Sequence, residues 1–141
     1  MKIKKLVFQN INSLYGKWTI DFDCKEFRQS GIFAILGKTG SGKSTILDAM
    51  CLALYGVTPR LKSSTIEAVS RGCNECMSEL TFIDTDGKEW TATYAYVTMK
   101  RGDKKGLIND TAIHKLSCNG KTEASKTKAV NKMVEEIKRL E

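Results

Sequence analysis

The sequence predicts an α/β fold in which a mixed sheet surrounds one central helix and continues into an antiparallel β arm. Three observations lead to this fold class. Several short runs alternate apolar with polar residues, or are rich in β-branched and aromatic residues, as strands are. One apolar run ends at a glycine-rich loop that a helical pattern follows. Two pairs, Asp86-Gly87 and Asn119-Gly120, mark tight hairpins further along the chain.

Two strands are expected at the start of the chain. The run 3–11 mixes apolar, β-branched and aromatic residues, and the turn formers Asn12 and Ser13 follow it. Apolar and polar residues then alternate over 18–23, which places the apolar ones on one face of a second strand. We expect these two strands to form a hairpin. The unbroken apolar run 31–36 is typical of a strand that is covered on both faces.

A helix is expected from Ser44 to Tyr55. Its residues are apolar or nearly so around the whole circumference, which predicts a buried helix. Gly56 stands where a C-terminal cap belongs, and the single proline, Pro59, follows three positions later.

The second half of the chain predicts the β arm and a last helix. The runs 77–84 and 90–99 are expected to be strands joined at Asp86-Gly87, and Asn119-Gly120 closes a further strand over 112–118. Apolar residues recur at helical spacing from Val130 to Leu140, with charged residues between them. This amphipathic helix needs a partner surface.

Composition limits the class of protein. The 141 residues, 41% hydrophobic and 28% charged, suit one folded domain and exclude disordered and fibrous classes. The longest apolar run, 49–55, is far shorter than the ~20 residues that cross a bilayer. We therefore expect a cytoplasmic protein with no membrane partner. The odd number of cysteines, five, predicts reduced thiols and not disulfides.

The strongest motif is a phosphate-binding loop, or Walker A motif, at Gly37–Ser44. It consists of a glycine, four residues, and Gly-Lys-Ser, with an apolar run before it and a helical pattern after it. The glycines allow positive φ angles, so successive N–H groups can point at phosphate oxygens from the positive end of a helix dipole. The motif predicts a nucleotide site.

Individual roles follow from the chemistry of this loop. Lys43 is expected to reach the β- and γ-phosphates, and Ser44 to offer a hydroxyl to Mg²⁺. Thr45 adds a hydroxyl and an amide near the α-phosphate. The residues assigned to the nucleotide site are Gly37, Lys38, Thr39, Gly40, Ser41, Gly42, Lys43, Ser44 and Thr45, with Ser44 as the metal ligand.

The segment before the loop favours an ABC/SMC-type ATPase, since small-molecule kinases of this class usually begin with the loop itself. Further characteristic residues are dense over 1–60, namely at 10–16, 20–22, 32–35, the phosphate loop and 45–60; they continue through 70–72 and thin beyond. In these residues the chain resembles the N-terminal half of the ATPase head of the SbcC family of SMC-like DNA-repair ATPases. The chain departs from several relatives near the first turn, where they carry a basic residue and this chain has Asn12, so the charge for a supplementary phosphate contact is absent at that position.

This resemblance implies that residues 1–141 are one lobe of a split head. The family's coiled coil, glutamine loop and C-terminal lobe, with its signature, Walker B and catalytic glutamate, lie outside this sequence. ATP and Mg²⁺ are the implied cofactors. The implied partners are a second head, double-stranded DNA ends and an SbcD-type nuclease subunit. No catalytic residue is assigned here, so we expect this lobe alone to bind ATP without hydrolysing it.

Charge suggests where DNA could bind. The net charge is +7, and the stretch 98–128 holds eight basic and three acidic residues. We take this stretch as the candidate contact with the DNA backbone, although a solvated face accounts for its composition equally well. The basic residues are Lys100, Arg101, Lys104, Lys105, Lys115, Lys121, Lys126 and Lys128.

Other motifs are weaker, and two alternative functions stay open. Asp84 ends a strand as a Walker B aspartate would, but Asp86-Gly87 favours a hairpin turn. The pair Cys73 and Cys76 lacks the further ligands of a structural zinc site, and His114 has no evident triad partner. A small-substrate kinase would need a lid of arginines, for which Arg60 and Arg71 are candidates. A DNA-binding module with a vestigial nucleotide loop is the other alternative.

Overall fold

The computed structural model describes residues 1–28, 34–59, 65–100 and 108–140. Its elements in chain order are β1 (Lys2–Ile11), β2 (Leu14–Asp21), α1 (Lys25–Arg28), α2 (Lys43–Tyr55), the 3₁₀ helix η1 (Thr65–Ala68), β3 (Glu75–Ile83), β4 (Glu89–Lys100), β5 (Ile108–Cys118), β6 (Lys121–Ala124) and α3 (Thr127–Arg139). The two longest helices, α2 and α3, have 13 residues each. No helix in the described ranges is long and apolar enough to cross a membrane.

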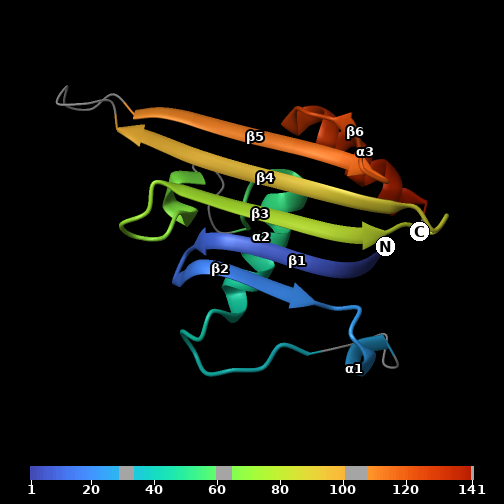
Figure 1. Ribbon diagram of the computed structural model, residues 1–141, viewed down its shortest axis with the longest axis horizontal. Coiled ribbons are helices and arrows are strands. Elements are labelled where there is room, and N and C mark those ends of the chain that lie inside the picture. Colours follow the sequence, from blue (N-terminus) through green and yellow to red (C-terminus); the bar gives the residue numbers. More distant parts are fainter. Residues whose placement is uncertain (29–33, 60–64, 101–107, 141) are drawn as a thin grey trace.

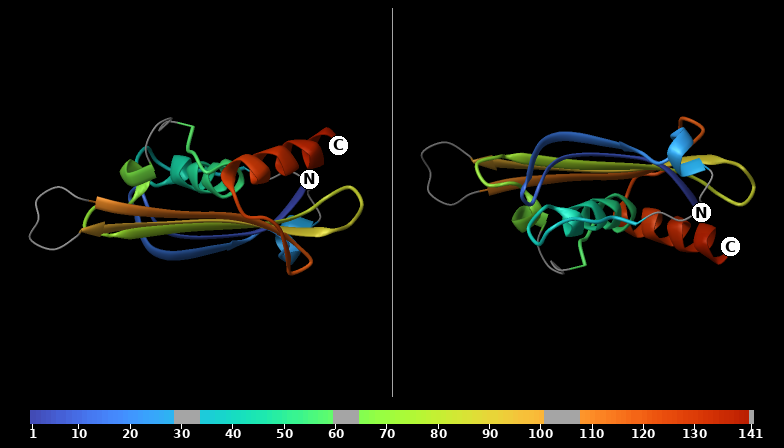
Figure 2. Two further views of the ribbon diagram at one scale, coloured as in Figure 1. Left: turned by 90° about the horizontal axis from the view of Figure 1, so that it is seen from above. Right: turned by 90° about the horizontal axis from the view of Figure 1, so that it is seen from below.

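The strands form one twisted six-stranded sheet in the order β2-β1-β3-β4-β5-β6 (Figure 1). Every pairing between described strands is antiparallel. Both α2 and α3 lie on the same face of this sheet, which is clear when the molecule is seen from above and from below (Figure 2). The expected α/β fold is confirmed, but the described sheet is antiparallel throughout and not mixed.

The core lies between this face and the two helices. Because side chains alternate across a strand, the even-numbered residues over 76–82 of β3 and 90–96 of β4 point to the helices and are buried. The helices contribute Leu52 of α2 and Val130 and Val134 of α3, which are fully buried against these strand residues. The buried residues of β3 and β4 are Cys76, Ser78, Leu80, Phe82, Trp90, Ala92, Tyr94 and Tyr96.

Helix α2 is positioned by both of its ends and by one hydrogen bond to the sheet. It begins after Gly42 and ends at Gly56, whose φ of 72° and N–H donation to the Leu52 carbonyl (2.9 Å) form the expected C-terminal cap. The Ser78 hydroxyl of β3 donates to the Ala49 carbonyl at 2.6 Å. The sheet thus fixes how α2 presents its first turn.

The prediction that α2 is buried around its whole circumference is wrong. Its buried residues recur at helical spacing, so one stripe faces the sheet, whereas Leu47 on the other side is 57% exposed. The sheet covers a single face, and no described element lies over the opposite one. The buried residues are Thr45, Asp48, Ala49, Leu52 and Ala53.

The strand expected at 31–36 is not found among the described residues. Positions 31–33 lie outside the described ranges, and Ala34–Leu36 have no regular secondary structure. Ile35 is 42% and Leu36 88% exposed, the opposite of a strand covered on both faces. An apolar run becomes a strand only where a free edge can pair with it, and no described strand pairs with this one. The parallel strand that a mixed sheet requires is therefore missing from the described sheet.

The predicted hairpins are confirmed. Asn119 (φ 48°) and Gly120 (φ 84°) supply the two positive φ angles of a tight turn between β5 and β6. The first hairpin pairs Phe8 with Trp18, so the apolar residues of β2 share the face expected for them, although Trp18 at this edge is 48% exposed. The turn at Asn119-Gly120 implied a following strand, but no range was predicted for it, and the structure shows it as β6. Its four residues are too few to show a period of two.

The partner surface of α3 consists of α2, β5 and β6. At this junction the buried His114 of β5 contacts two helices. Its Nε2 lies 2.9 Å from the Ala53 carbonyl oxygen, and its Nδ1 lies 3.2 Å from the Thr127 hydroxyl. Since a carbonyl oxygen can only accept, the neutral ring carries its proton on Nε2, and Nδ1 accepts from Thr127. His114 is a structural tie and not part of a catalytic triad.

This histidine should make stability depend on pH. Burial lowers the pKa of His114 below its ordinary value of 6.5, although the bond to Ala53 opposes the shift. Below pH 6.5 the unfolded chain therefore binds more protons than the folded one, and the free energy of unfolding falls until the folded group titrates too. We expect urea unfolding to give lower stability at pH 5.5 than at pH 7.5. His114→Gln should remove most of this difference, because the chain has no other histidine.

Candidate nucleotide-binding site

The predicted phosphate loop leads directly into the first turn of α2. Gly40 (φ 83°) and Gly42 (φ 92°) adopt the left-handed conformation that the motif requires. The Ser41 N–H donates to the Lys38 carbonyl at 3.1 Å, which closes a tight turn before the helix. No described side chain caps the helix at Gly42. The first N–H groups of α2, at the positive end of its dipole, are therefore available to an anion.

Lys43 closes this loop with its side chain. Its ammonium group donates to the carbonyl oxygens of Gly37 and Lys38, the latter at 2.9 Å. The cation is thereby held over the loop backbone, where an incoming phosphate would meet it. Residues 37–41 around it are exposed, so the loop faces solvent.

A cavity of about 500 Å³ lies beside the loop. Its volume falls within the range of about 300–1,000 Å³ that is usual for small-molecule sites. One wall is the turn between β1 and β2, and the other is the loop with the first turn of α2. The lining residues are Asn12, Ser13, Thr39, Gly40, Gly42, Lys43, Ser44 and Thr45. The structure thus brings most of the predicted site residues together with two from the first hairpin.

Asn12 and Asp48 were not among the predicted site residues. The Asn12 side-chain amide donates to the Asp48 carboxylate at 2.9 Å and to the Thr45 hydroxyl at 3.3 Å. These partners are 36 and 33 positions away, so local sequence gives no direct sign of the contact. Two signals pointed to this position: the turn itself, because asparagine tolerates the positive φ that Asn12 adopts (49°), and the basic residue that several relatives carry there.

The other motifs have structural roles. Asp84 lies in the β3–β4 turn, where its carboxylate accepts from the Trp90 indole N–H (2.7 Å) and from the backbone N–H groups of Asp86 and Lys88. Burial would raise the pKa of Asp84, but these hydrogen bonds lower it. Burial raises the pKa of the Cys76 thiol to about 12, so this group stays protonated and is a poor metal ligand. No metal-ligand cluster is found among the described residues.

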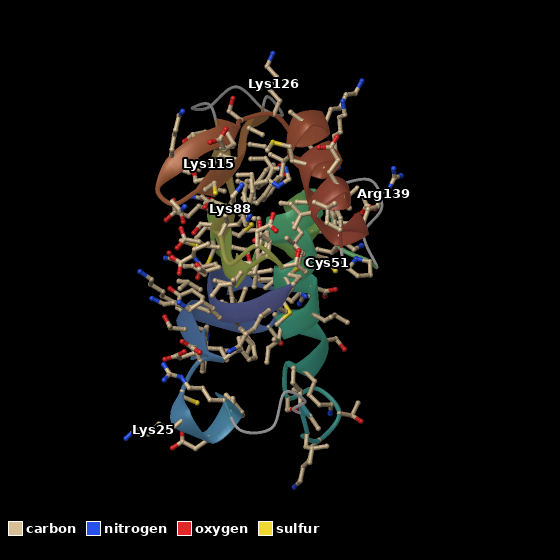
Figure 3. The ribbon with its side chains drawn as sticks, turned by 90° about the vertical axis from the view of Figure 1, so that its right-hand side faces the viewer. Lys25, Cys51, Lys88, Lys115, Lys126 and Arg139 are labelled. Carbon is tan, nitrogen blue, oxygen red and sulfur yellow. The ribbon has the colours of Figure 1, made fainter. Side chains whose placement is uncertain are left out.

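The basic stretch is described in part. Arg101, Lys104 and Lys105 lie outside the described ranges. Lys115, Lys121, Lys126 and Lys128 are exposed. Figure 3 places Lys115 and Lys126 at the opposite end of the molecule from Lys25 of α1. In the sheet order, β5 and β6 are likewise at the far edge from β2, which borders the phosphate loop through its turn.

Comparison with known protein families agrees with this geometry. Residues 5–140 match a family described as AAA domain. The chain belongs to the AAA domain family. The matched range includes the phosphate loop, the whole of α2 and all but the first residues of the sheet.

This AAA domain is also similar to curated SbcC proteins, which are named as a subunit of the SbcCD nuclease. It is 38% identical over 111 residues to the one from Pseudomonas aeruginosa, which covers 67% of the chain and 9% of the relative. It is 35% identical over 153 residues to the one from Rhodobacter capsulatus, covering 95% of the chain and 12% of the relative. The predicted resemblance to the SbcC family is confirmed. The chain spans about a tenth of the length of these relatives.

The fold has a counterpart among solved structures. A chain from work on ATP-driven dimerization and DNA-stimulated activation of SMC ATPases aligns with a TM-score of 0.63 at 20% identity. The alignment covers 97% of this AAA domain and 77% of that chain. The antiparallel sheet with α2 and α3 on one face is therefore a fold that this chain shares with an SMC ATPase structure.

Proposed function

We propose that this AAA domain is the ATP-binding N-terminal lobe of the head of an SbcC-like ATPase in DNA double-strand-break repair. In the whole, cytoplasmic protein, two heads close on ATP and control an SbcD-type nuclease that acts on double-stranded DNA ends. The similarity to SbcC proteins supports this assignment, and the SMC-type fold is consistent with it.

The observation that carries the proposal is the arrangement at the start of α2. Two glycines with positive φ, an uncapped first turn and the Lys43 ammonium border one cavity. Each of these features favours an anion, and the cavity is large enough for more than one phosphate group. A chance match to the motif would not assemble them in one place.

The residues present also fit a magnesium ion. Ser44 lines the cavity and is exposed in the first turn of α2. A serine hydroxyl is a suitable ligand for a cation that keeps most of its water and phosphate ligands. Bound there, Mg²⁺ would neutralise charge on the phosphates. Ser44 would hold the ion, and Lys43 would bind the phosphate oxygens.

The cavity explains why this lobe should bind ATP without hydrolysing it. None of the described residues that line it is acidic. Asp48 does not line the cavity. Its carboxylate is buried, with the residue 4% exposed, and accepts a hydrogen bond from the Asn12 side-chain amide. A base that orients an attacking water must come within hydrogen-bond reach of it. We assign that role to residues outside this lobe.

Contact with the DNA backbone is assigned to the basic stretch 98–128. Its described lysines 115, 121, 126 and 128 are exposed. Lys115 of β5 and Lys121 of β6 belong to the edge of the sheet opposite β2, and Figure 3 shows Lys115 and Lys126 at the opposite end of the molecule from Lys25. DNA bound there would leave the nucleotide cavity open, and each neutralised phosphate would make binding more sensitive to salt.

The test combines calorimetric titration of MgATP with a phosphate-release assay on the same chain. We expect saturable binding and no release above that of free ATP. Steady hydrolysis, or transfer of phosphate to a small acceptor, would contradict the proposal and favour a complete enzyme such as a kinase. Binding of duplex DNA without any binding of ATP would instead favour a DNA-binding module with a vestigial nucleotide loop.

A further inference from the structure

Asn12 is fixed by its main chain as well as by its side chain. It has a φ of 49°, its N–H donates to the Ala68 carbonyl at 2.7 Å, and its carbonyl accepts from the Ser70 hydroxyl at 2.8 Å. Together with the two side-chain bonds, these contacts connect three segments: the β1–β2 turn, the first turns of α2, and the end of η1 with the residues that follow it. This residue lines the cavity beside the phosphate loop.

The side-chain bonds set the direction of the Thr45 hydroxyl. An amide NH₂ group has two protons and no lone pair for accepting, and here it donates to both Thr45 Oγ1 and Asp48 Oδ2. Thr45 is therefore an acceptor toward Asn12. Its own proton is left for another acceptor. Thr45 lines the cavity and is 3% exposed, so an anion in the cavity is a suitable partner.

We propose that Asn12 is a positioning residue for the bound nucleotide: it holds Thr45 so that the threonine hydroxyl donates to a phosphate oxygen in the cavity. This inference rests on the proposed function, because it concerns the same site. Asp48 supports this arrangement. An ionised carboxylate can only accept hydrogen bonds, so the Asn12 side-chain amide must turn its NH₂ group, and not its oxygen, toward α2.

Asn10 provides a matched control in the same hairpin. It also has a positive φ (53°), and it is 7% exposed. Its side chain accepts from the Gly16 N–H at 2.9 Å and contacts the Glu75 carbonyl at 3.4 Å. None of these groups lines the nucleotide cavity. Removing the Asn10 side chain therefore disturbs the hairpin without removing a bond to α2.

The experiment is calorimetric titration of MgATP into the 141-residue chain and its variants. Glycine is the replacement of choice at both asparagines, because it adopts their positive φ without strain. We expect Asn12→Gly and Thr45→Val each to weaken MgATP binding about ten- to a hundredfold, the usual result of losing one hydrogen bond to a charged group. The double variant should be within about twofold of the weaker single variant, because both changes remove the same contact. Asn10→Gly should stay within about twofold of the unsubstituted chain.

Several outcomes would overturn the inference. These are an Asn12→Gly affinity equal to that of the unsubstituted chain, an equal loss in Asn10→Gly, or losses in Asn12→Gly and Thr45→Val that add fully. Thermal unfolding of each variant, in the absence of nucleotide, separates a lost contact from a lost fold. If Asn12→Gly does not fold, Asn12→Asp keeps the shape of the side chain and lacks both donors. Because it also places a negative charge beside Asp48 and the bound phosphates, a loss at least as large is expected from it, and an unchanged affinity would overturn the inference.

These results are distinguishable from failure of the proposed function. If the unsubstituted chain does not bind MgATP, the proposed function fails together with this inference. If it binds MgATP through Lys43 and Asn12→Gly makes no difference, the nucleotide site stands and the role of Asn12 is refuted.

Discussion

Replacing Lys43 with alanine should weaken MgATP binding by roughly a hundredfold or more. The ammonium group is the one cationic side chain among the described residues that line the cavity. Losing two hydrogen bonds to charged groups, at about 1.5–3 kcal/mol each, corresponds to at least this factor. The measurement is calorimetric titration of MgATP into both proteins at the same ionic strength.

The matched control is Lys88→Ala. It removes the same unit of charge, and Lys88 lies in the β3–β4 turn, away from the phosphate loop (Figure 3). We expect its affinity for MgATP to equal that of the unsubstituted chain. Equal weakening in both variants would mean that net charge attracts the nucleotide, and the assignment of Lys43 would be lost. The fold should survive Lys43→Ala, because the bonds from Lys43 to the loop are exposed.

Replacing Gly42 with alanine should lower the free energy of unfolding by about 2–3 kcal/mol and also weaken MgATP binding. The left-handed φ of 92° costs a residue with a Cβ about 1–2 kcal/mol. The new Cβ would also lie 2.9–3.0 Å from the side chain of Leu14, which must move. Because Gly42 starts α2, any shift there redirects the N–H groups that face the cavity. Urea unfolding and calorimetry measure the two effects.

Gly40→Ala separates backbone strain from the contact with Leu14. Gly40 has a similar φ of 83°, but no atom lies within 4 Å of an added Cβ. We expect it to lose about 1–2 kcal/mol of stability, the cost of the left-handed conformation alone. If Gly42→Ala is no more costly than Gly40→Ala, Leu14 moves aside freely and the close contact has no energetic weight. Adding Leu14→Ala to Gly42→Ala tests the same point directly.

What could be predicted from the sequence depended on local chemistry. The phosphate loop, the Gly56 cap and the Asn119-Gly120 turn were all found because a backbone conformation with positive φ needs glycine or asparagine at a fixed place. The shared face of the apolar residues of β2 followed from a period of two. In each case the signal and the structure it describes lie within a few residues of each other.

The remaining features depend on partners that are distant in the chain. The Asn12 contact with Asp48 and the His114 contact with Ala53 span 36 and 61 positions. The exposure of Ile35, Leu36 and Leu47 likewise depends on distant parts of the chain, because no described element covers these side chains. Their hydrophobicity shows that they can be buried, but burial also requires a covering surface, and the composition of one segment does not say whether such a surface is present.

The order of strands in the sheet has a kinetic consequence. Each pair from β3 to β6 is adjacent in sequence as well as in space, so these strands can pair early. Pairing of β1 with β3 must close a much longer loop, since Asn10 and Glu75 are 65 positions apart. Closing that loop costs more chain entropy, which makes it a late step in folding. The nucleotide cavity lies between the β1–β2 turn and α2, so it is completed last. Deletion of the first hairpin should then abolish ATP binding, because it removes one wall of the cavity.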